Sequence, residues 1–191
     1  MSHVTIWMRP WEKKPAAAIS ISIRKIEKFK IISGGQTGVD RGALEAALDC
    51  NAECGGWCPA GRLDENGRIP ERYPLTELLS AGYSERTARN VADSDGTLII
   101  YAGALAGGTR ETLARCVEFA KSYVAIDLSS ISIEHATDLA EQFISNHHLR
   151  VLNVAGPRAS EWSEGYSHAY EIVSGLLRRL SGQMTGTGYS A

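Results

Sequence analysis

The sequence predicts a three-layer α/β/α sandwich, in which helices cover both faces of a mostly parallel sheet of about five strands. Short apolar segments alternate along the chain with segments of helical periodicity, and right-handed crossovers then favour a parallel sheet. The segments 96–101 and 150–155 are mostly apolar rather than alternating, as expected for strands that are buried on both faces. Three apolar segments end in a glycine-rich break that opens a helix, which is how such sheets present backbone N–H groups to an anion.

The alternation gives the expected elements in order along the chain, each strand an apolar run and each helix a segment of 3.6-residue periodicity. Strands are expected at residues 29–33, 53–58, 96–101, 123–128 and 150–155. Helices are expected at residues 39–49, 85–92, 110–122, 133–147 and 164–180. The irregular segment that follows residue 58 is long for a compact domain, and loops of this length are usually lids or binding elements.

The first strand is the natural centre of this sheet. If the second strand lies on one side of it and the third on the other, strand order reverses at the first strand. Ligands of doubly wound sheets bind beyond the carboxyl ends of the strands at such a point. The loops after the strands at 29–33 and 96–101 would then face each other and form one pocket.

The composition fits a single domain at residues 29–180. The chain has 191 residues and 43% of them are hydrophobic, which is enough for one well-buried core. Residues 1–28 are predicted to be an extension outside that core, because they show no sustained period and contain helix-interrupting prolines. Residues 181–191 are rich in Gly, Ser and Thr and are predicted to be a flexible tail.

Charge and hydropathy argue against two classes of partner. The formal net charge of −2 and a pI near 6.2 give no basic footprint for nucleic acid. No apolar run approaches the roughly 18 residues that a membrane helix needs. The short apolar segment 16–23 makes a poor signal peptide, because its Ile-Ser pattern alternates and no cleavage site follows it. A cytoplasmic protein with a small-molecule partner is expected, and a homo-oligomer is left open.

The cysteines suggest a metal site at first sight. Cys50, Cys54 and Cys58 recur every four residues, and Cys116 stands apart. Structural zinc sites pair such a motif with a second pair of ligands, which is missing here. The spacing also runs from a helix end into a strand, which points the thiols in different directions. Reduced, buried cysteines and no metal site are therefore predicted.

The first glycine-rich loop, residues 33–40, is the strongest candidate for ligand binding. Its glycines allow a tight turn and can open the next helix with free N–H groups, while its Gln and Thr add side-chain donors. It matches neither a dinucleotide-binding fingerprint nor a P-loop. In the purely structural alternative it is a tight turn whose acidic residue complements the helix dipole. The candidate residues are Gly34, Gly35, Gln36, Thr37, Gly38 and Asp40.

Two further segments carry candidates near the third strand. Gly107 and Gly108 precede Thr109, which is expected to cap a helix that begins at Arg110, and together they are suited to cradle an anion. The alternative for this loop is ordinary helix capping.

On the preceding helix, Arg86 and Asn90 share a face because they lie four residues apart. Arg86 is suited to clamp a phosphate and Asn90 to hydrogen-bond the edge of a base or pterin. Alternatively, Arg86 only pairs with Glu85 or Asp93.

The third loop, residues 153–162, adds a second cation. Asn153 lies in an apolar strand, where a buried amide needs partners, and Arg158 at the rim is a candidate for holding an anion. A surface turn is the alternative. Trp57 and Tyr73 both lie in the irregular stretch 55–75, and they either stack on a flat ring or wedge that stretch against the domain.

Taken together and in this order, the motifs resemble the molybdenum carrier family. That family belongs to a wider group of Rossmann-like domains, which includes the lysine-decarboxylase-like "lonely guy" proteins. The resemblance runs from about residue 29 to residue 180. The motifs that carry it are Ser33-Gly34-Gly35-Gln36-Thr37-Gly38-Val39-Asp40, Gly55-Gly56-Trp57-Cys58-Pro59, Arg86-Thr87 with Asn90-Val91, Ser94-Asp95, Gly107-Gly108-Thr109 and Leu152-Asn153-Val154-Ala155-Gly156-Pro157-Arg158.

The resemblance implies a Rossmann-like domain that binds a phosphate-bearing heterocycle, with molybdenum cofactor as the ligand that the family name suggests. It implies that the pocket residues are Gly34, Gly35, Gln36, Thr37, Gly38, Asp40, Arg86, Asn90, Gly107, Gly108 and Thr109. One departure is Ala60, at a position where relatives often carry Lys. A missing cation there would weaken anion contact from the long loop.

The lonely-guy relatives imply an alternative function, hydrolysis of nucleoside monophosphates to free base and ribose phosphate. Their motif, Pro-Gly-Gly-x-Gly-Thr-x-x-Glu, places an essential Glu three residues after the Thr. Here that position is Thr112, and Glu111 comes one residue early, about a 100° rotation on a helix. No catalytic residue is therefore assigned, and binding without turnover is favoured. A purely structural or interaction domain would explain the sheet but not three glycine-rich loops.

Overall fold

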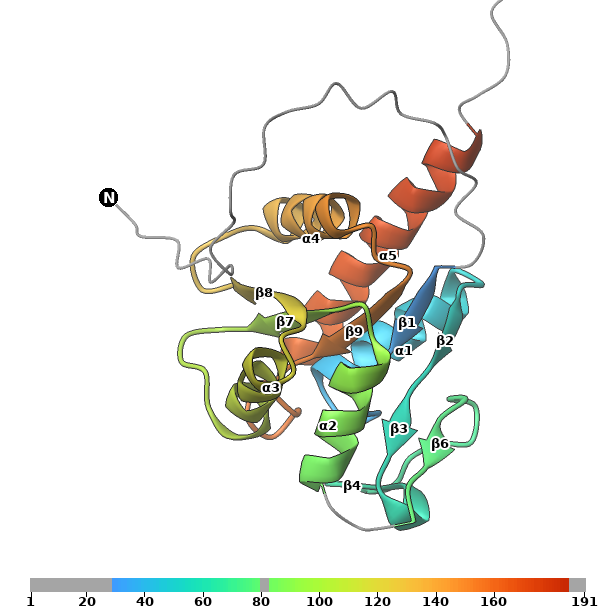
Figure 1. The fold of residues 1–191 in the computed structure, drawn as a ribbon, viewed down its shortest axis with the longest axis vertical. Helices are drawn as coiled ribbons and strands as arrows, with labels where there is room; N and C mark the ends of the chain where they lie inside the picture. Colours follow the sequence, from blue (N-terminus) through green and yellow to red (C-terminus); the bar gives the residue numbers. More distant parts are fainter. Residues whose placement is uncertain (1–28, 80–82, 186–191) are drawn as a thin grey trace, which may run out of the picture.

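The computed structural model describes residues 29–79 and 83–185. The predicted N-terminal extension and residues 186–191 of the predicted tail lie outside the described residues. Within them, the main sheet has five strands, all parallel, and helices cover both of its faces (Figure 1). The predicted fold class is confirmed. The strands are β1 (Lys30–Ile32), β2 (Glu53–Gly55), β7 (Gly96–Tyr101), β8 (Ser122–Asp127) and β9 (Val151–Ala155).

The strand order is β2-β1-β9-β7-β8, which differs from the predicted order. The last strand, β9, lies between β1 and β7, with Leu152 opposite Ile31 and Val154 opposite Leu98. The physical reason is helix packing: the helix after β9 packs along the helix after β1, so their strands are neighbours. The prediction that the loops after β1 and β7 face each other directly is therefore wrong.

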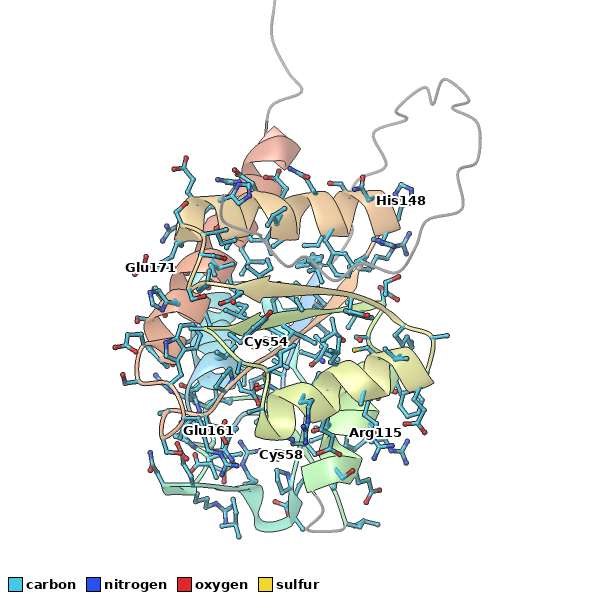
Figure 2. The ribbon with its side chains drawn as sticks, turned by 90° about the vertical axis from the view of Figure 1, so that its left-hand side faces the viewer. Cys54, Cys58, Arg115, His148, Glu161 and Glu171 are labelled. Atoms are coloured by element: carbon cyan, nitrogen blue, oxygen red, sulfur yellow. The ribbon has the colours of Figure 1, made fainter. Side chains whose placement is uncertain are left out.

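Five helices form the outer layers in the described part of the chain. They are α1 (Val39–Asp49), α2 (Tyr83–Asp93), α3 (Gly107–Glu118), α4 (Ile133–His147) and α5 (Gly165–Thr185). Helices α1, α4 and α5 pack on one face of the sheet, and α2 and α3 on the other. Figure 2 shows α4 and α3 on opposite sides of β7 and β8. Helix α5 continues to residue 185, five residues beyond its expected end.

The core explains why β7 is apolar throughout. Leu98 and Ile100 are buried in the cluster with α1, α4 and α5, whereas Ile99 and Tyr101 are buried against α3. Successive side chains of a strand point to opposite faces, so a strand covered on both sides has no solvent-facing position. Each fully buried Leu or Ile of this kind contributes about 1.5–3 kcal/mol. Among the helices described, none is long and apolar enough to cross a membrane.

The predicted strand 53–58 is interrupted at Gly56. Its φ of 127° favours glycine, and a Cβ there would collide with the carbonyl oxygen of Ser33. The chain leaves the main sheet at this point and forms β3 (Trp57–Cys58), which pairs with β6 (Thr76–Glu77). Between them lie the short 3₁₀ helix η1 (Ala60–Arg62) and the hairpin of β4 (Leu63–Asp64) and β5 (Gly67–Arg68). We call residues 59–79 the long loop.

Arg62 holds the long loop together from inside. Its side chain is buried, and its guanidinium donates hydrogen bonds of 2.9–3.5 Å to backbone carbonyls across the loop. The acceptors are the carbonyl oxygens of Ile69, Pro70, Tyr73 and Leu75. The same part of the loop packs its apolar side chains against Leu44 of α1. Irregular backbone can be buried here because one charged side chain satisfies its carbonyl groups.

Candidate functional site

Three loops meet at the carboxyl edge of the sheet, and the loop after β9 lies between the other two. A Cβ at Gly38 would collide with the carbonyl oxygen of Pro157, so the loop after β1 touches the loop after β9. On the other side, a Cβ at Gly107 would lie 3.3 Å from the Glu161 carboxylate. Figure 2 places Glu161 at this end of the sheet and His148 at the opposite end. The structure therefore brings together the three predicted loops, although not as two facing loops.

The polar side chains of the first loop make contacts within the protein. The Gln36 side-chain carbonyl accepts hydrogen bonds from the backbone N–H groups of Thr37 (3.0 Å) and Glu65 (3.1 Å). The Thr37 hydroxyl donates to the Glu65 carboxylate and accepts from the Ala159 N–H (3.1 Å). Gly35 and Gly38 have φ angles of 74° and 73°, which β-carbon-bearing residues rarely adopt. The loop thus joins β1, the long loop and the loop after β9.

The structure places Arg86 and Asp40 together beside this loop. The Arg86 guanidinium lies 3.3 Å from the Asp40 carboxylate, and a Cβ at Gly34 would collide with that guanidinium. Asp40 is 4% exposed and also accepts the Gln36 N–H (3.3 Å). Burial raises the pKa of Asp40 above its usual value, while the charge of Arg86 acts in the opposite direction. Arg86 therefore brings positive charge from α2 against the backbone of the first loop.

Asn90 lies one turn further along α2 and contacts backbone. Its Oδ1 accepts the Trp57 N–H (2.9 Å), and its Nδ2 donates to the Trp57 carbonyl oxygen (3.0 Å). The Trp57 indole N–H donates to Asp93 (2.7 Å), and Arg89 lies over the indole ring. Asn90 thus takes the place of a strand partner where the chain has left the main sheet at Gly56. Its predicted contact with a ligand stays a prediction.

The N-terminus of α3 differs from the prediction. The helix begins at Gly107, and its N-cap residue is Ala106, with no capping hydrogen bond from a side chain. Thr109 is therefore the third helical residue rather than the N-cap. Thr109 is 2% exposed, and its hydroxyl has no hydrogen-bond partner among the described residues. A Cβ at Gly108 would point into open space: apart from its chain neighbours and the backbone of its own helix, no atom of the described residues lies within 4 Å.

The early start of α3 has a local cause. The Arg110 N–H donates to the Ala106 carbonyl (3.1 Å), and the Thr112 hydroxyl donates to the Gly108 carbonyl (3.0 Å). These bonds close the first turn without a capping side chain, so the turn presents backbone N–H groups that capping normally satisfies.

In the third loop, Arg158 is 43% exposed and pairs with Glu161 (3.1 Å). The Asn153 amide in β9 donates to the Thr97 hydroxyl of β7 (3.3 Å), which supplies the partner that its burial requires.

Glu65 also belongs to this edge, although no sequence motif points to it. It lies in the hairpin of β4 and β5, and its carboxylate accepts from the Ser160 N–H (3.1 Å), the Ser160 hydroxyl and the Thr37 hydroxyl. The Arg158 Nε atom is 3.9 Å away. Partial burial raises the pKa of Glu65, but the hydrogen bonds outweigh it and hold the pKa below its usual value. In sequence it is part of an ordinary polar hairpin turn, so no local signal marks it.

The cysteines are free thiols, and burial raises the pKa of Cys54, Cys58 and Cys116. Among the described residues, no three or more His, Cys, Asp or Glu side chains come together as metal ligands.

Comparisons with known proteins agree with the fold and the motifs. The family described as the circularly permutated YpsA SLOG family matches residues 31–177. The 1.45 Å crystal structure of a "putative molybdenum carrier protein" from Syntrophus aciditrophicus SB is 47% identical and superposes with a TM-score of 0.77, covering 78% of this chain and 95% of that one. A comparison with curated proteins finds no match. The chain belongs to the circularly permutated YpsA SLOG family.

Proposed function

We propose that this protein binds a phosphate-bearing heterocycle, with the phosphate at the N-terminus of α3. The observation that carries the proposal is the buried Thr109 hydroxyl, which has no partner in the described part of the chain. Leaving a buried hydroxyl unsatisfied costs about 1–3 kcal/mol, and native proteins rarely do so without a reason. A phosphate oxygen at this turn would accept its hydrogen bond.

The surroundings of Thr109 support an anion. The turn has uncapped backbone N–H groups, and the positive end of the helix dipole favours a negative ligand. The open space at Gly108 lets a ligand approach the backbone closely. Arg86 lies on α2, a helix that packs beside α3, and its guanidinium faces Asp40 and Gly34 of the first loop. We propose that it adds positive charge for the ligand from that side.

We propose molybdenum cofactor (molybdopterin) as the first candidate ligand and a nucleotide-like molecule as the second. The name of the crystallised relative points to molybdenum, and the turn at Thr109 fits a phosphate group. The described residues bring no cluster of metal-ligating side chains to this edge, so this chain would hold the cofactor through its phosphate and its ring system. When bound, the cofactor would supply molybdenum that it already carries, so the chain would need no metal ligands of its own.

We also propose that binding occurs without turnover and in the cytoplasm. The Glu111 carboxylate accepts the Ser84 hydroxyl and pairs with Arg115 (3.6 Å), whereas the position with hydrolase spacing holds buried Thr112. This arrangement supports binding over hydrolysis of the N-glycosidic bond. The free thiols of the four cysteines support a reducing compartment.

Native mass spectrometry of freshly purified protein tests the proposal. We expect an adduct whose mass identifies a phosphorylated heterocycle. Gly108→Val should lose the adduct, because the new side chain fills the approach to the helix N-terminus. Gly182→Val is the matched control, since a Cβ at that α5 position also meets no described atom within 4 Å. An adduct that survives at full occupancy in Gly108→Val would place the site elsewhere.

A further inference from the structure

The Glu65 carboxylate accepts several hydrogen bonds and does not simply pair with one cation. Ser160 contributes its backbone N–H (3.1 Å) and its hydroxyl, Thr37 contributes its hydroxyl, and Arg158 adds a guanidinium at 3.9 Å. These donors come from the loops after β1 and β9, whereas Glu65 comes from the long loop. A backbone N–H, two hydroxyls and a guanidinium form the kind of donor set that binds phosphate groups. We call Thr37, Arg158 and Ser160 the cradle.

Contacts that do not involve Glu65 hold the cradle in place. The Thr37 hydroxyl oxygen accepts the Ala159 N–H (3.1 Å), which leaves its hydrogen directed to another acceptor. Arg158 is held by Glu161 (3.1 Å), and the Val39 N–H donates to the Pro157 carbonyl (3.2 Å). The turn that carries Ser160 is closed by the Glu161 and Trp162 N–H groups, which both donate to the Arg158 carbonyl (3.0 Å). The donors would therefore keep their positions after Glu65 leaves.

The hairpin that carries Glu65 is held to the domain by polar contacts. Asp64 pairs with Arg41 (2.5 Å), the Glu65 N–H donates to Gln36 (3.1 Å), and Leu63 is 51% exposed. The rest of the long loop is held by Arg62 and by apolar packing on α1. The hairpin can thus exchange its polar contacts for others while the base of the loop stays packed.

We propose that the cradle is a binding site for a tetrahedral oxyanion such as a phosphate group, and that Glu65 fills it until an anionic group displaces the carboxylate. The proposal rests on the proposed function, because it gives the same ligand a second anionic group, separate from the one at Thr109. Glu65 is then an internal competitor. The apparent affinity of the cradle for phosphate is then its intrinsic affinity multiplied by the fraction of molecules in which Glu65 has left the cradle.

Titration of the full-length, ¹⁵N-labelled protein with inorganic phosphate tests the proposal, with the Ser160 amide signal as the readout. Glu65→Ala should bind phosphate at Ser160 at least about tenfold more tightly than the parent, because it removes both the competitor and a negative charge. Glu65→Gln, which keeps the side-chain shape, should show a gain in the same direction and serves if Glu65→Ala does not fold. Ser160→Ala added to Glu65→Ala should remove most of the gain.

Asp64→Asn is the matched control. It removes one negative charge and the ion pair with Arg41 from the same hairpin but leaves Glu65 in the cradle. The affinity of this variant for phosphate at Ser160 should therefore stay within about twofold of the parent. Equal affinities of Glu65→Ala and Asp64→Asn at Ser160 would overturn the proposal and make Glu65 a structural contact. The Gly108 amide in the same spectra reports on the proposed site at α3. A signal shift at Ser160 without one at Gly108 would support the cradle and contradict the proposed site at α3. A shift at Gly108 without one at Ser160 would do the reverse.

Discussion

The N-termini of α1 and α3 lie at the same edge of the sheet, and each follows a glycine-rich loop. At α1, the loop after β9 covers the turn: the Val39 N–H donates to the Pro157 carbonyl, and Gly38 packs against the backbone of residues 157–159. At α3, no side chain of the described residues caps the turn, and the Thr109 hydroxyl has no partner there. Similar sequence patterns therefore give one closed and one open helix end. The loop after β9 packs its backbone against the start of α1, whereas at the start of α3 it brings only the Glu161 side chain near Gly107.

The largest expected difference between the two helix ends is in the effect of an alanine substitution on the free energy of unfolding. Gly38→Ala should lower the free energy of unfolding by at least about 2 kcal/mol, because a positive φ and a clash with the Pro157 carbonyl are both unfavourable. Gly108→Ala should raise it by up to about 1 kcal/mol, because alanine favours a helix and the space is open. Urea denaturation of both variants measures the difference. Equal effects would show that the two ends are not distinct.

Arg86→Ala should weaken binding of adenosine monophosphate at least about tenfold more than binding of adenosine. A charge-assisted hydrogen bond to phosphate contributes about 1.5–3 kcal/mol, and only the phosphorylated probe loses it. Calorimetric titration of both probes measures the two losses. Arg89→Ala on the same helix is the control, since Arg89 lies over the Trp57 ring instead. Equal losses for the two probes would make Arg86 a structural residue that supports buried Asp40.

A smaller effect is expected at the cradle, where the contribution of Glu65 to the free energy of unfolding depends on pH. Because the folded protein lowers the pKa of Glu65 below its usual 4.5, its carboxylate stabilises the fold above that value. This stabilisation is lost as the pH falls through the lowered pKa. The difference in unfolding free energy between the parent and Glu65→Gln should therefore be constant near neutral pH and shrink below about pH 4.5. Urea denaturation between pH 7 and pH 3 measures it. A difference that grows on acidification would contradict the assigned hydrogen bonds.

The smallest expected effect is on catalysis. The parent should release no free base from adenosine monophosphate, as followed by chromatography of the products. Glu111→Gln should leave this result unchanged, because Glu111 contacts Ser84 and Arg115. Hydrolysis by the parent that is lost in Glu111→Gln would favour the hydrolase alternative. Hydrolysis that survives would direct attention to Asp40, which Asp40→Asn would test.

Local patterns predicted much of the fold. The bounds of α1, β7 and α4 agree with the sequence prediction residue for residue, because their periodicity and their glycine or polar boundaries are local. The strand order could not be predicted from such local patterns. It depends on the packing of α5 along α1, a contact between segments more than 100 residues apart. The interruption at Gly56 depends equally on a distant atom, the carbonyl oxygen of Ser33.

The site was predicted only in part for the same reason. The three loops and Arg86 were selected from glycines and from helical spacing, and they do meet at one edge. The start of α3 was misplaced, because Thr109 looks like a capping residue when the bonds of the Ala106 and Gly108 carbonyls are unknown. Arg62 and Glu65 were missed because their partners are carbonyls and hydroxyls in other segments, which leave no spacing in the sequence.

The position of β9 also affects how the protein is made. Synthesis on the ribosome completes β1, β2, β7 and β8 before β9, the strand that joins the two pairs, has emerged. Until then, β1 and β7 each expose an unpaired apolar edge, and such edges pair readily with other chains. The sheet cannot close until β9 has been translated, and closure then depends on contacts between distant segments, which form slowly. The nascent chain therefore stays exposed to edge-to-edge aggregation until its central strand arrives.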